Sequence, residues 1–472
     1  MIGLSPGQLD PAAENPLYRQ LYEQIRSAIK MGSVRNGDRL PATRELAVEL
    51  GLNRTTVSAA YALLEEEGLI RGEVGRGSFV QYEGEFTTAP VTSTISFASS
   101  RPAEDHFPIE EFRSTCQEVI QSAQVGTILQ LGSPSGYGPL RHHLLEQARA
   151  EGSAGPEDDI LITSGCQQAL DILQRAFIGP ADAVQLEDPV YHGLKNVFSR
   201  VGARLLGIPV RESGMDLDQL ARTIESEHPR MIVVTPEFQN PTGATLPLEH
   251  RERLARLVEA AGVLLVENCI YRELRYEGEQ IRTLKSLAPG TLQIGSFSKV
   301  AFPGLRVGWV IGPRALIARL TETKQWCDLH SDQLSQAILL RFAESGRLEQ
   351  HLRRVRTMGA ARLHTALDGC SRYLPAGTRF SRPQGGMSLW VRLPEPLDAN
   401  ELLPRVQRER VDYLPGKHFS ISHFDAGSLR LSFGGLSPEQ IESGLATLGR
   451  VINEEGKRLR SAISFDAAPA MV

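Results

Sequence analysis

The chain has 472 residues, 41% of them hydrophobic and 23% charged, and a formal net charge of −5. This length exceeds one ordinary hydrophobic core, so we expect roughly two or three domains in a soluble globular protein. No apolar run approaches the ~18 residues of a membrane span and no secretory signal pattern opens the chain, so we expect a cytoplasmic protein with no membrane partner. The five cysteines lack metal-type spacing, which argues against a zinc site. The slight negative charge restricts any DNA contact to a local surface.

Helices and a small hairpin are predicted at the start of the chain. Apolar residues at helical spacing predict one helix over 16–30 and a second over 43–50, which stops at Gly51. Asn53 is placed to cap a third helix. Two short helices joined by a tight glycine turn indicate a helix-turn-helix. The glycine-rich turn 72–77 separates two short apolar runs, which predicts a two-stranded wing.

This segment resembles the winged helix-turn-helix of GntR-type transcription regulators, and the motifs that carry the likeness lie at 40–47, 51–57 and 67–70. In such domains the start of the third helix enters the major groove. The resemblance implies that double-stranded DNA is contacted by Arg44, Arg54, Thr55, Thr56 and, at the wing, Arg76. The acidic run 65–67 counts against DNA binding. Because it lies toward the end of the third helix, we interpret it as a solvent-exposed face.

The chain is predicted to divide into a DNA-binding domain over 1–82, a linker over 83–95 and a large body over 96–460. The linker residues are small and polar and show neither helical nor strand periodicity. A linker this short favours mechanical coupling between the two domains over free tethering. The last residues, 461–472, are expected to form a loosely ordered tail.

Strand-like and helical patterns alternate through the body. Apolar runs such as 160–162 and 231–235 are separated by amphipathic stretches such as 249–260. This alternation predicts a mainly parallel sheet covered by helices on both faces. A smaller α+β lobe is expected over about 341–460.

A lysine, two serines and an arginine follow the predicted strand 291–294, namely Lys299, Ser296, Ser298 and Arg306. The ends of strands are where α/β folds hold their ligands. A lysine there can form a Schiff base with an aldehyde, and hydroxyls and a guanidinium are the donors that a phosphate requires. An aldehyde and a phosphate together indicate pyridoxal 5′-phosphate (PLP).

Further stretches at predicted strand ends suit other parts of a PLP site. Residues 164–168 open a helix, so their main-chain N–H groups can hold a phosphate. Tyr191 offers an aromatic ring to stack on the pyridine. Asn240 and Tyr271 can bind the ring hydroxyl of the cofactor, and Arg430 suits a carboxylate.

The order and the amino-acid sequences of these stretches resemble those of fold-type I aminotransferases, from about Phe97 to Ile452. The likeness is carried by Asn-Pro-Thr-Gly at 240–243, Ser-x-Ser-Lys-x-x-x-Pro-Gly-x-Arg at 296–306 and Arg-x-Ser-Phe at 430–433. It implies the α/β fold of fold-type I PLP-dependent transferases, with an internal aldimine at Lys299.

The same resemblance assigns the remaining cofactor contacts. It implies that the phosphate is bound by Ser164, Gly165, Cys166, Gln167, Ser296, Ser298 and Arg306. It places Asn240 and Tyr271 at the ring hydroxyl, Tyr191 on the ring face, and Arg430 on the carboxylate of an effector or substrate. Such domains form dimers with the site at the interface, which makes Tyr137 a candidate contact to the partner's phosphate.

One position departs from the aminotransferase pattern. Aminotransferases normally carry an aspartate three residues before the motif tyrosine Tyr271, where this chain has Asn268. A buried carboxylate keeps the pyridine nitrogen protonated, which makes the cofactor an electron sink, and a neutral amide does not stabilise the pyridinium in that way. Adjacent strand residues face opposite sides, so we do not expect Glu267 to substitute. We interpret Cys269 as a buried structural thiol in preference to a redox group.

A GntR-like head joined to an aminotransferase-like body resembles the MocR family of bacterial transcription regulators, which includes the GabR and PdxR types. The resemblance implies a homodimer that binds PLP and paired DNA half-sites. Its signal would be an amine or amino-acid effector, or PLP itself. The main alternative is a working PLP-dependent aminotransferase with an attached DNA-binding head. Asn268 counts against the enzyme, whereas the intact Arg430 leaves it open. A third possibility, a pocket that no longer binds PLP, is disfavoured because Lys299 and the phosphate donors are retained.

Overall fold

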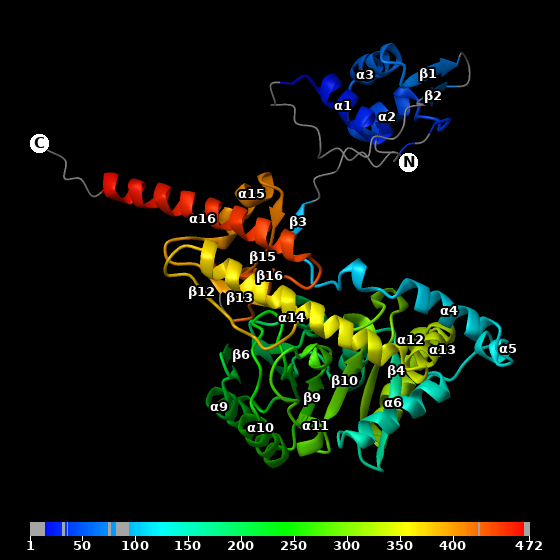
Figure 1. The fold of residues 1–472 in the computed structure, drawn as a ribbon, viewed down its shortest axis with the longest axis vertical. Coiled ribbons are helices and arrows are strands. Elements are labelled where there is room, and N and C mark those ends of the chain that lie inside the picture. The colour runs from blue at the N-terminus through cyan, green and yellow to red at the C-terminus, as the bar shows by residue number, and fades with distance from the viewer. Residues whose placement is uncertain are drawn as a thin grey trace, which may run out of the picture. The chain divides into compact units, whose positions relative to one another are not determined.

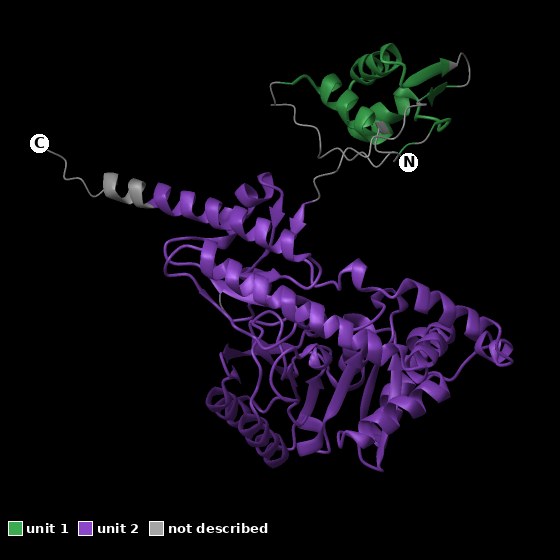
Figure 2. Ribbon diagram, viewed as in Figure 1, with its two compact units in different colours: residues 1–93 green, residues 94–472 purple. Residues whose placement is uncertain are grey.

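The computed structural model describes residues 15–30, 34, 36–73, 77–81, 94–422 and 425–466. The chain divides into two compact units, residues 1–93 and 94–472 (Figure 2). Their boundary falls inside the segment that the sequence analysis assigned to the linker. Among the described residues, no helix is both long and apolar enough to cross a membrane.

The first unit is a winged helix-turn-helix, as predicted (Figure 1). Its elements are α1 (Leu17–Lys30), α2 (Thr43–Leu50), α3 (Arg54–Glu66), β1 (Ile70–Glu73) and β2 (Gly77–Val80). Gly51 ends α2 with a φ of 65°, in the left-handed region that glycine adopts without strain. The Asn53 side chain accepts a hydrogen bond from Thr55 N and caps α3. Strands β1 and β2 pair antiparallel as the wing.

The three helices of this unit pack around one hydrophobic core. Leu21 and Ile25 of α1, Leu46 of α2, and Val57 and Leu64 of α3 are all buried there. With Leu50 of α2 and Ala60 of α3, which are also buried there, each helix contributes residues three or four positions apart, and such residues lie on one face of a helix. The unit therefore has a core of its own.

The acidic run at the end of α3 is exposed, as predicted, but it also makes structural contacts. Glu67 accepts hydrogen bonds from Tyr22 Oη at 2.5 Å and from Arg26 Nε at 2.9 Å, which tie α1 to the end of α3. Glu65 Oε1 accepts from Gly72 N at 2.9 Å and holds the start of the wing. The run is more than a solvated face.

The second unit contains an eight-stranded sheet with the order β4-β11-β10-β9-β8-β5-β6-β7. Its strands are β4 (Asp158–Thr163), β5 (Ala183–Asp188), β6 (Arg204–Arg211), β7 (Gly214–Met215), β8 (Met231–Val234), β9 (Leu264–Asn268), β10 (Leu292–Ser296) and β11 (Gly308–Pro313). Strands β11 and β7 run antiparallel to their neighbours, and the other strands run in one direction. The mainly parallel sheet expected from the sequence is confirmed.

Helices cover both faces of this sheet (Figure 1). They are α4 (Ile109–Ile120), α5 (Val125–Ile128), α6 (Gly138–Ala150), α7 (Cys166–Phe177), α8 (His192–Ser199), α9 (Leu217–Glu227), α10 (Leu248–Ala261), α11 (Leu284–Leu287), α12 (Arg314–Asp328) and α13 (Gln333–Glu344). Along β8, Met231 and Val233 pack in a cluster with α6, α7 and α12, whereas Ile232 and Val234 pack in a cluster with α9, α10 and α11. Burial on both faces explains the continuous apolar run of this strand.

A smaller α+β lobe completes the unit. It comprises α14 (Arg347–Tyr373), β12 (Arg379–Phe380), β13 (Ser388–Arg392), α15 (Ala399–Arg408), β14 (Val411–Asp412), β15 (Leu414–Pro415), β16 (Ser428–Ser432) and α16 (Pro438–Asp466). Strand β14 pairs in parallel with β3 (Ile95–Ser96), so the chain enters the unit through this lobe.

Two boundaries differ from the sequence-based expectation. Ile95, which we assigned to the linker, already belongs to β3. Helix α16 continues to Asp466, so residues 461–466 are helical although we expected a loose tail there. No glycine or proline interrupts the sequence from 457 to 466, so nothing in it stops the helix. Residues 467–472, like most of the predicted linker, lie outside the described residues.

Candidate functional site

The predicted cofactor residues converge at one edge of the large sheet. Ser164 follows β4, Tyr191 follows β5, Asn240 follows β8, Asn268 ends β9 and Lys299 follows β10. These strands run in one direction, so their carboxyl ends lie at the same edge. The structure therefore brings together residues that are far apart in the sequence, in the crevice where open α/β sheets bind ligands.

Lys299 lies at the end of a short 3₁₀ helix, Phe297–Lys299, directly after β10. Its Nζ donates a hydrogen bond to Ser100 O at 2.7 Å and lies 5.7 Å from the centre of the Tyr271 ring. Burial lowers the pKa of Lys299 to about 8, and the charges of Arg430 and Arg306 act in the same direction. At a given pH, Lys299 is therefore neutral more often than a solvent-exposed lysine. The neutral amine is the form that attacks an aldehyde.

Hydroxyl and guanidinium donors gather at the end of the site that begins α7. Arg306 Nη1 donates to Ser298 Oγ at 3.3 Å and Nη2 donates to Ser164 O at 3.2 Å. Ser296 Oγ lies 3.0 Å from Ser298 Oγ. Gly165 precedes α7 with a φ of 81°, and a Cβ atom there would overlap the Arg306 guanidinium. The positive φ favours glycine here, and the resulting cradle suits a phosphate.

Cys166 and Gln167 are the first two residues of α7, so their main-chain N–H groups have no acceptor within the helix. Ser164 N donates to Gln168 Oε1 at 2.6 Å, and Gln168 Nε2 donates to Asp328 Oδ2 at 2.7 Å. The sequence analysis gave no role to the side chain of Gln168. The structure shows that it fixes the loop in front of α7.

Arg430, Asn240 and Tyr271 form a hydrogen-bonded row. Arg430 Nη1 donates to Asn240 Oδ1 at 2.9 Å, and Asn240 Nδ2 donates to Tyr271 Oη at 3.3 Å. Arg430 Nη2 donates to Ala98 O at 2.6 Å, while Arg430 Nε is buried and has no partner among the described residues. Burial raises the pKa of Tyr271 to about 12, which keeps its hydroxyl protonated. The row offers an unused Nε–H donor to a ligand.

The two other predicted tyrosines lie at the starts of helices. Tyr191 precedes α8, and a Cβ atom on Gly193 would overlap its ring. Burial raises the pKa of Tyr191, with smaller effects from Cys166 and Tyr271, so the ring lies close to the other site residues. Tyr137 precedes α6 and its main-chain N donates to Gln336 Oε1 at 2.8 Å. Its contact with a partner's phosphate stays a prediction.

Asn268 presents an unpaired acceptor at the end of β9. Its Nδ2 donates to Thr235 Oγ1 at 3.2 Å, whereas its Oδ1 is buried without a partner among the described residues. The neighbouring Glu267 accepts hydrogen bonds from the main-chain N–H groups of Leu284 and Lys285 at 2.8 and 3.0 Å. Glu267 is therefore engaged at α11 and does not take the place of the missing aspartate.

Two protein-family models match the chain. The model described as aminotransferase class I and II matches residues 97–448, and the model described as bacterial regulatory proteins of the gntR family matches residues 17–80. The chain belongs to the aminotransferase class I and II family. In front of this aminotransferase domain the chain carries a GntR-type helix-turn-helix. The two domains in this order are the arrangement of MocR-like transcription regulators, as the sequence predicted.

Individual relatives agree with both parts. The chain is 36% identical to 2-aminoadipate transaminase of Thermus thermophilus over 76% of this chain and 90% of the relative. It is 28% identical to the probable rhizopine catabolism regulatory protein MocR of Rhizobium meliloti over 93% of this chain and 94% of the relative, a span that includes the first unit.

A solved structure connects the fold to the cofactor. LysN, an α-aminoadipate aminotransferase from Thermus thermophilus complexed with N-(5′-phosphopyridoxyl)-L-leucine, has a TM-score of 0.72 and 36% identity, and the match covers 76% of this chain and 92% of LysN. Pyridoxal 5′-phosphate is the cofactor of the aminotransferase class I and II family, so the cofactor expected from the sequence is confirmed. The cradle at Gly165 and the orphaned Asn268 Oδ1 suit its phosphate and its ring nitrogen.

Sequence reasoning missed several contacts of the aminotransferase site. The carbonyl oxygens of Ala98 and Ser100 hold Arg430 and Lys299. Main-chain carbonyls carry no residue-type signal, so nothing in the sequence singles them out. Thr235, which holds the amide of Asn268, is the last residue of the predicted strand 231–235 and could have been noticed by its hydroxyl.

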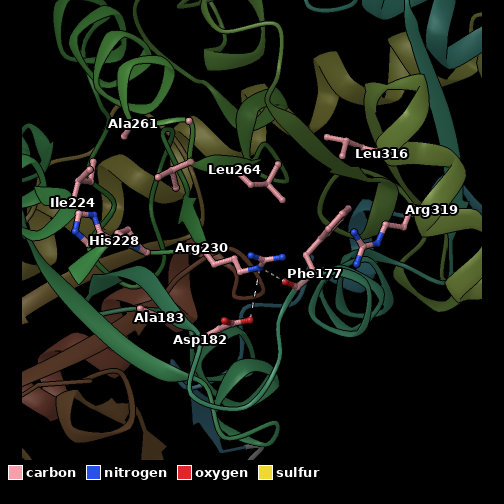
Figure 3. Close-up of a pocket in the computed structure, with 13 residues that line it drawn as sticks. Phe177, Asp182, Ala183, Ile224, His228, Arg230, Ala261, Leu264, Leu316 and Arg319 are labelled. Carbon is pink, nitrogen blue, oxygen red and sulfur yellow. Dashed lines mark hydrogen bonds and ion pairs between the residues drawn. The ribbon is translucent and has the colours of Figure 1, made fainter. Parts of the chain in front are cut away.

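A hollow of about 560 Å³ lies elsewhere in the aminotransferase domain (Figure 3). It is lined by Ala183, Arg230 and Leu264 at the amino ends of β5, β8 and β9, and by Phe177 and Arg319 from α7 and α12. Arg230 Nε donates to Phe177 O at 3.1 Å, as Figure 3 shows. None of the predicted cofactor residues lines this hollow, which is at the opposite end of the strands.

Four of the five residues predicted to contact DNA lie on α2 and α3 of the GntR-type unit. Arg44 is exposed on α2. Arg54 and Thr55 are exposed in the first turn of α3, and Thr56 beside them is half-buried. Arg76 lies outside the described residues. The exposed first turn of the third helix is free to present side chains to a groove, so these assignments stay predictions with a suitable geometry.

Proposed function

We propose that this MocR-like regulator binds PLP through Lys299, senses an amine or amino acid in the same pocket, and as a homodimer changes its affinity for paired DNA half-sites. PLP itself is the signal in a simpler version of the same scheme. Action on DNA places the protein in the cytoplasm.

The position of Arg430 is the observation on which this proposal mainly rests. Arg430 is linked through Asn240 to Tyr271, whose ring lies beside Lys299 Nζ. Its Nε is buried without a partner among the described residues, so a donor is available to a carboxylate. A carboxylate site linked in this way to the cofactor lysine matches a ligand that carries an amine and a carboxylate on the same carbon, as an α-amino acid does.

The other residues of the pocket have assignable tasks. When bound, PLP supplies an aldehyde that condenses reversibly with amines. Ser164 to Gln167 and Ser296, Ser298 and Arg306 hold the phosphate. Tyr191 covers the ring, Asn240 and Tyr271 bind the ring hydroxyl, and Asn268 faces the ring nitrogen. Lys299, which burial shifts toward the neutral amine, forms the covalent attachment.

Exposed apolar side chains support the dimer. Leu131 is 76% exposed and Trp326 is 83% exposed. Gln333 Nε2 donates to Gln130 O at 2.8 Å, so the segment that carries Leu131 lies at the start of α13, close in sequence to the end of α12 and Trp326. Exposed apolar side chains that gather in one region are typical of protein interfaces. We infer that they pair with a second copy.

A catalytically active aminotransferase with an attached DNA-binding head is the second candidate. It is favoured by the intact Arg430 and by the retained Lys299 and phosphate donors. Asn268 at the ring nitrogen counts against it, because a neutral amide stabilises the protonated ring less than the usual aspartate does, and proton removal from a substrate depends on that form.

One set of measurements separates these functions. The purified full-length protein, supplied with PLP, is expected to show a visible absorption band that Lys299→Ala removes. Its affinity for DNA flanking its own gene should change when an amino acid that alters this band is added. Steady turnover of an amino-acid and keto-acid pair, together with no change in DNA affinity, would identify the enzyme instead.

A further inference from the structure

We propose that Glu187 is a positioning residue which acts through Thr235 on Asn268, so that the Asn268 amide selects the protonated form of the cofactor's pyridine nitrogen. This inference rests on the proposed position of Asn268 at that nitrogen. It answers the question raised by the missing aspartate, because it places a carboxyl group in the same network by another route.

The three residues come from neighbouring strands and are hydrogen-bonded in a row. Glu187, in β5, accepts from Thr235 N at 3.1 Å, and Thr235 directly follows β8. The side chains of Thr235 and Gln239 lower the pKa of Glu187 against the larger, raising effect of burial, so they act on its carboxyl as well. Asn268, at the end of β9, donates from Nδ2 to Thr235 Oγ1 at 3.2 Å. All of these groups are buried, so water does not compete for them.

The donor and acceptor in each of these hydrogen bonds follow from the threonine hydroxyl, which carries a single proton to donate. When that proton is donated to Glu187, Thr235 Oγ1 is left as an acceptor for Asn268 Nδ2. The Oδ1 atom of Asn268 then faces away from Thr235, and it is this atom that is buried without a partner among the described residues. A buried acceptor of this kind is unfavourable until a donor reaches it.

The pyridine nitrogen is that donor only when it carries a proton. The neutral nitrogen is an acceptor and would oppose Asn268 Oδ1, whereas the protonated nitrogen would donate to it. Burial raises the pKa of Glu187 to about 8, and its hydrogen bonds to Thr235 and Gln239 favour the ionised form. A positive ring at the other end of the row also favours that form, so the ring proton and the Glu187 charge stabilise each other.

Glu187 could instead be a structural residue that satisfies Thr235 N and nothing more. The two roles differ in what they do to the ring nitrogen. In the structural role, substitutions at Glu187 or Thr235 change the stability of the fold but not the protonation of the bound cofactor. Glu267 provides a matched control, since it is a buried carboxylate next to Asn268 that bonds to α11 instead.

The test measures the protonation of the ring nitrogen directly. The full-length protein is loaded with PLP carrying ¹⁵N in the ring, and the ¹⁵N chemical shift reports the protonated fraction. In Thr235→Val, which keeps the branched shape and removes the hydroxyl, we expect the protonation equilibrium to move about tenfold toward the neutral ring, or about one pKa unit. Glu187→Gln should move it in the same direction, and Thr235→Ser should restore the wild-type shift.

Each outcome decides the proposal. A wild-type ¹⁵N shift in loaded Thr235→Val and Glu187→Gln would overturn it, and so would an equal effect from Glu267→Gln. Thr235→Ser keeps the test valid if Glu187→Gln fails to fold, because restoration by serine and loss by valine concern the hydroxyl alone. Failure of the wild-type protein to bind PLP would be a different result, since it would remove the cofactor placement on which this inference rests.

Discussion

Lys299 Nζ lies 2.7 Å from the carbonyl oxygen of Ser100, a residue just after the point where the chain enters the aminotransferase domain. Two residues earlier, the carbonyl of Ala98 accepts a hydrogen bond from Arg430 at 2.6 Å. One short stretch of main chain therefore holds two of the site's cations, Lys299 and Arg430. A cofactor that engages Lys299, or a ligand that moves Arg430, acts directly on the stretch that follows the linker.

The rate at which the apoprotein takes up PLP should rise with pH and level off above about 8. Only the neutral amine of Lys299 attacks an aldehyde. Burial lowers the pKa of this lysine to about 8, so the neutral form increases as the pH rises through that value. Stopped-flow absorbance after mixing with PLP measures the rate, and Lys299→Ala should show no band. An inflection at the ordinary pKa of a lysine would show that the amine is not desolvated.

Replacing Arg430 should weaken the binding of amino acids far more than that of simple amines. In Arg430→Met the carboxylate loses a charge-assisted contact, which is typically about 1.5–3 kcal/mol, or at least tenfold in Kd. Titration of the visible band gives both constants. The amine that lacks the carboxylate is the matched control, and its Kd should change little. Equal losses for both ligands would mean that Arg430 does not meet the carboxylate.

Arg54→Ala should weaken DNA binding and leave the visible band intact. Arg54 is exposed in the first turn of α3, and a side chain at a base or phosphate is typically worth about 1–3 kcal/mol. Fluorescence anisotropy with a labelled DNA fragment at one fixed salt concentration measures the effect. Arg222→Ala removes the same charge from an exposed position on α9 and should bind DNA like the wild type. Unchanged affinity in Arg54→Ala would mean that another element reads the DNA.

Local signals in the sequence predicted much of the fold. Gly51 and Asn53 end one helix and begin the next because their conformational freedom and capping oxygen act within a few residues. The residues around Lys299 were found because strand ends in a parallel sheet meet at one edge. These features depend on the local chain or on a general rule of topology.

Contacts between distant segments were not predictable in the same way. The carbonyl of Ser100 meets Lys299, 199 residues later, and no property of serine indicates it. The row from Glu187 to Asn268 depends on the order of β5, β8 and β9 in the sheet, which the sequence does not state. The hydrogen bonds that hold Lys299 and Arg430 and the proposed substitute for the missing aspartate both depend on such contacts.

Asn268→Asp should raise the rate of the transamination half-reaction with an amine by about tenfold or more, because a carboxylate at the ring nitrogen stabilises the protonated ring directly. Single-turnover conversion of the bound cofactor, followed by absorbance, measures this rate. The gain should be larger in a Thr235→Val background, since an aspartate contacts the ring without needing the threonine to orient it. A half-reaction that does not change in either background would show that ring protonation is not what limits the chemistry in this pocket.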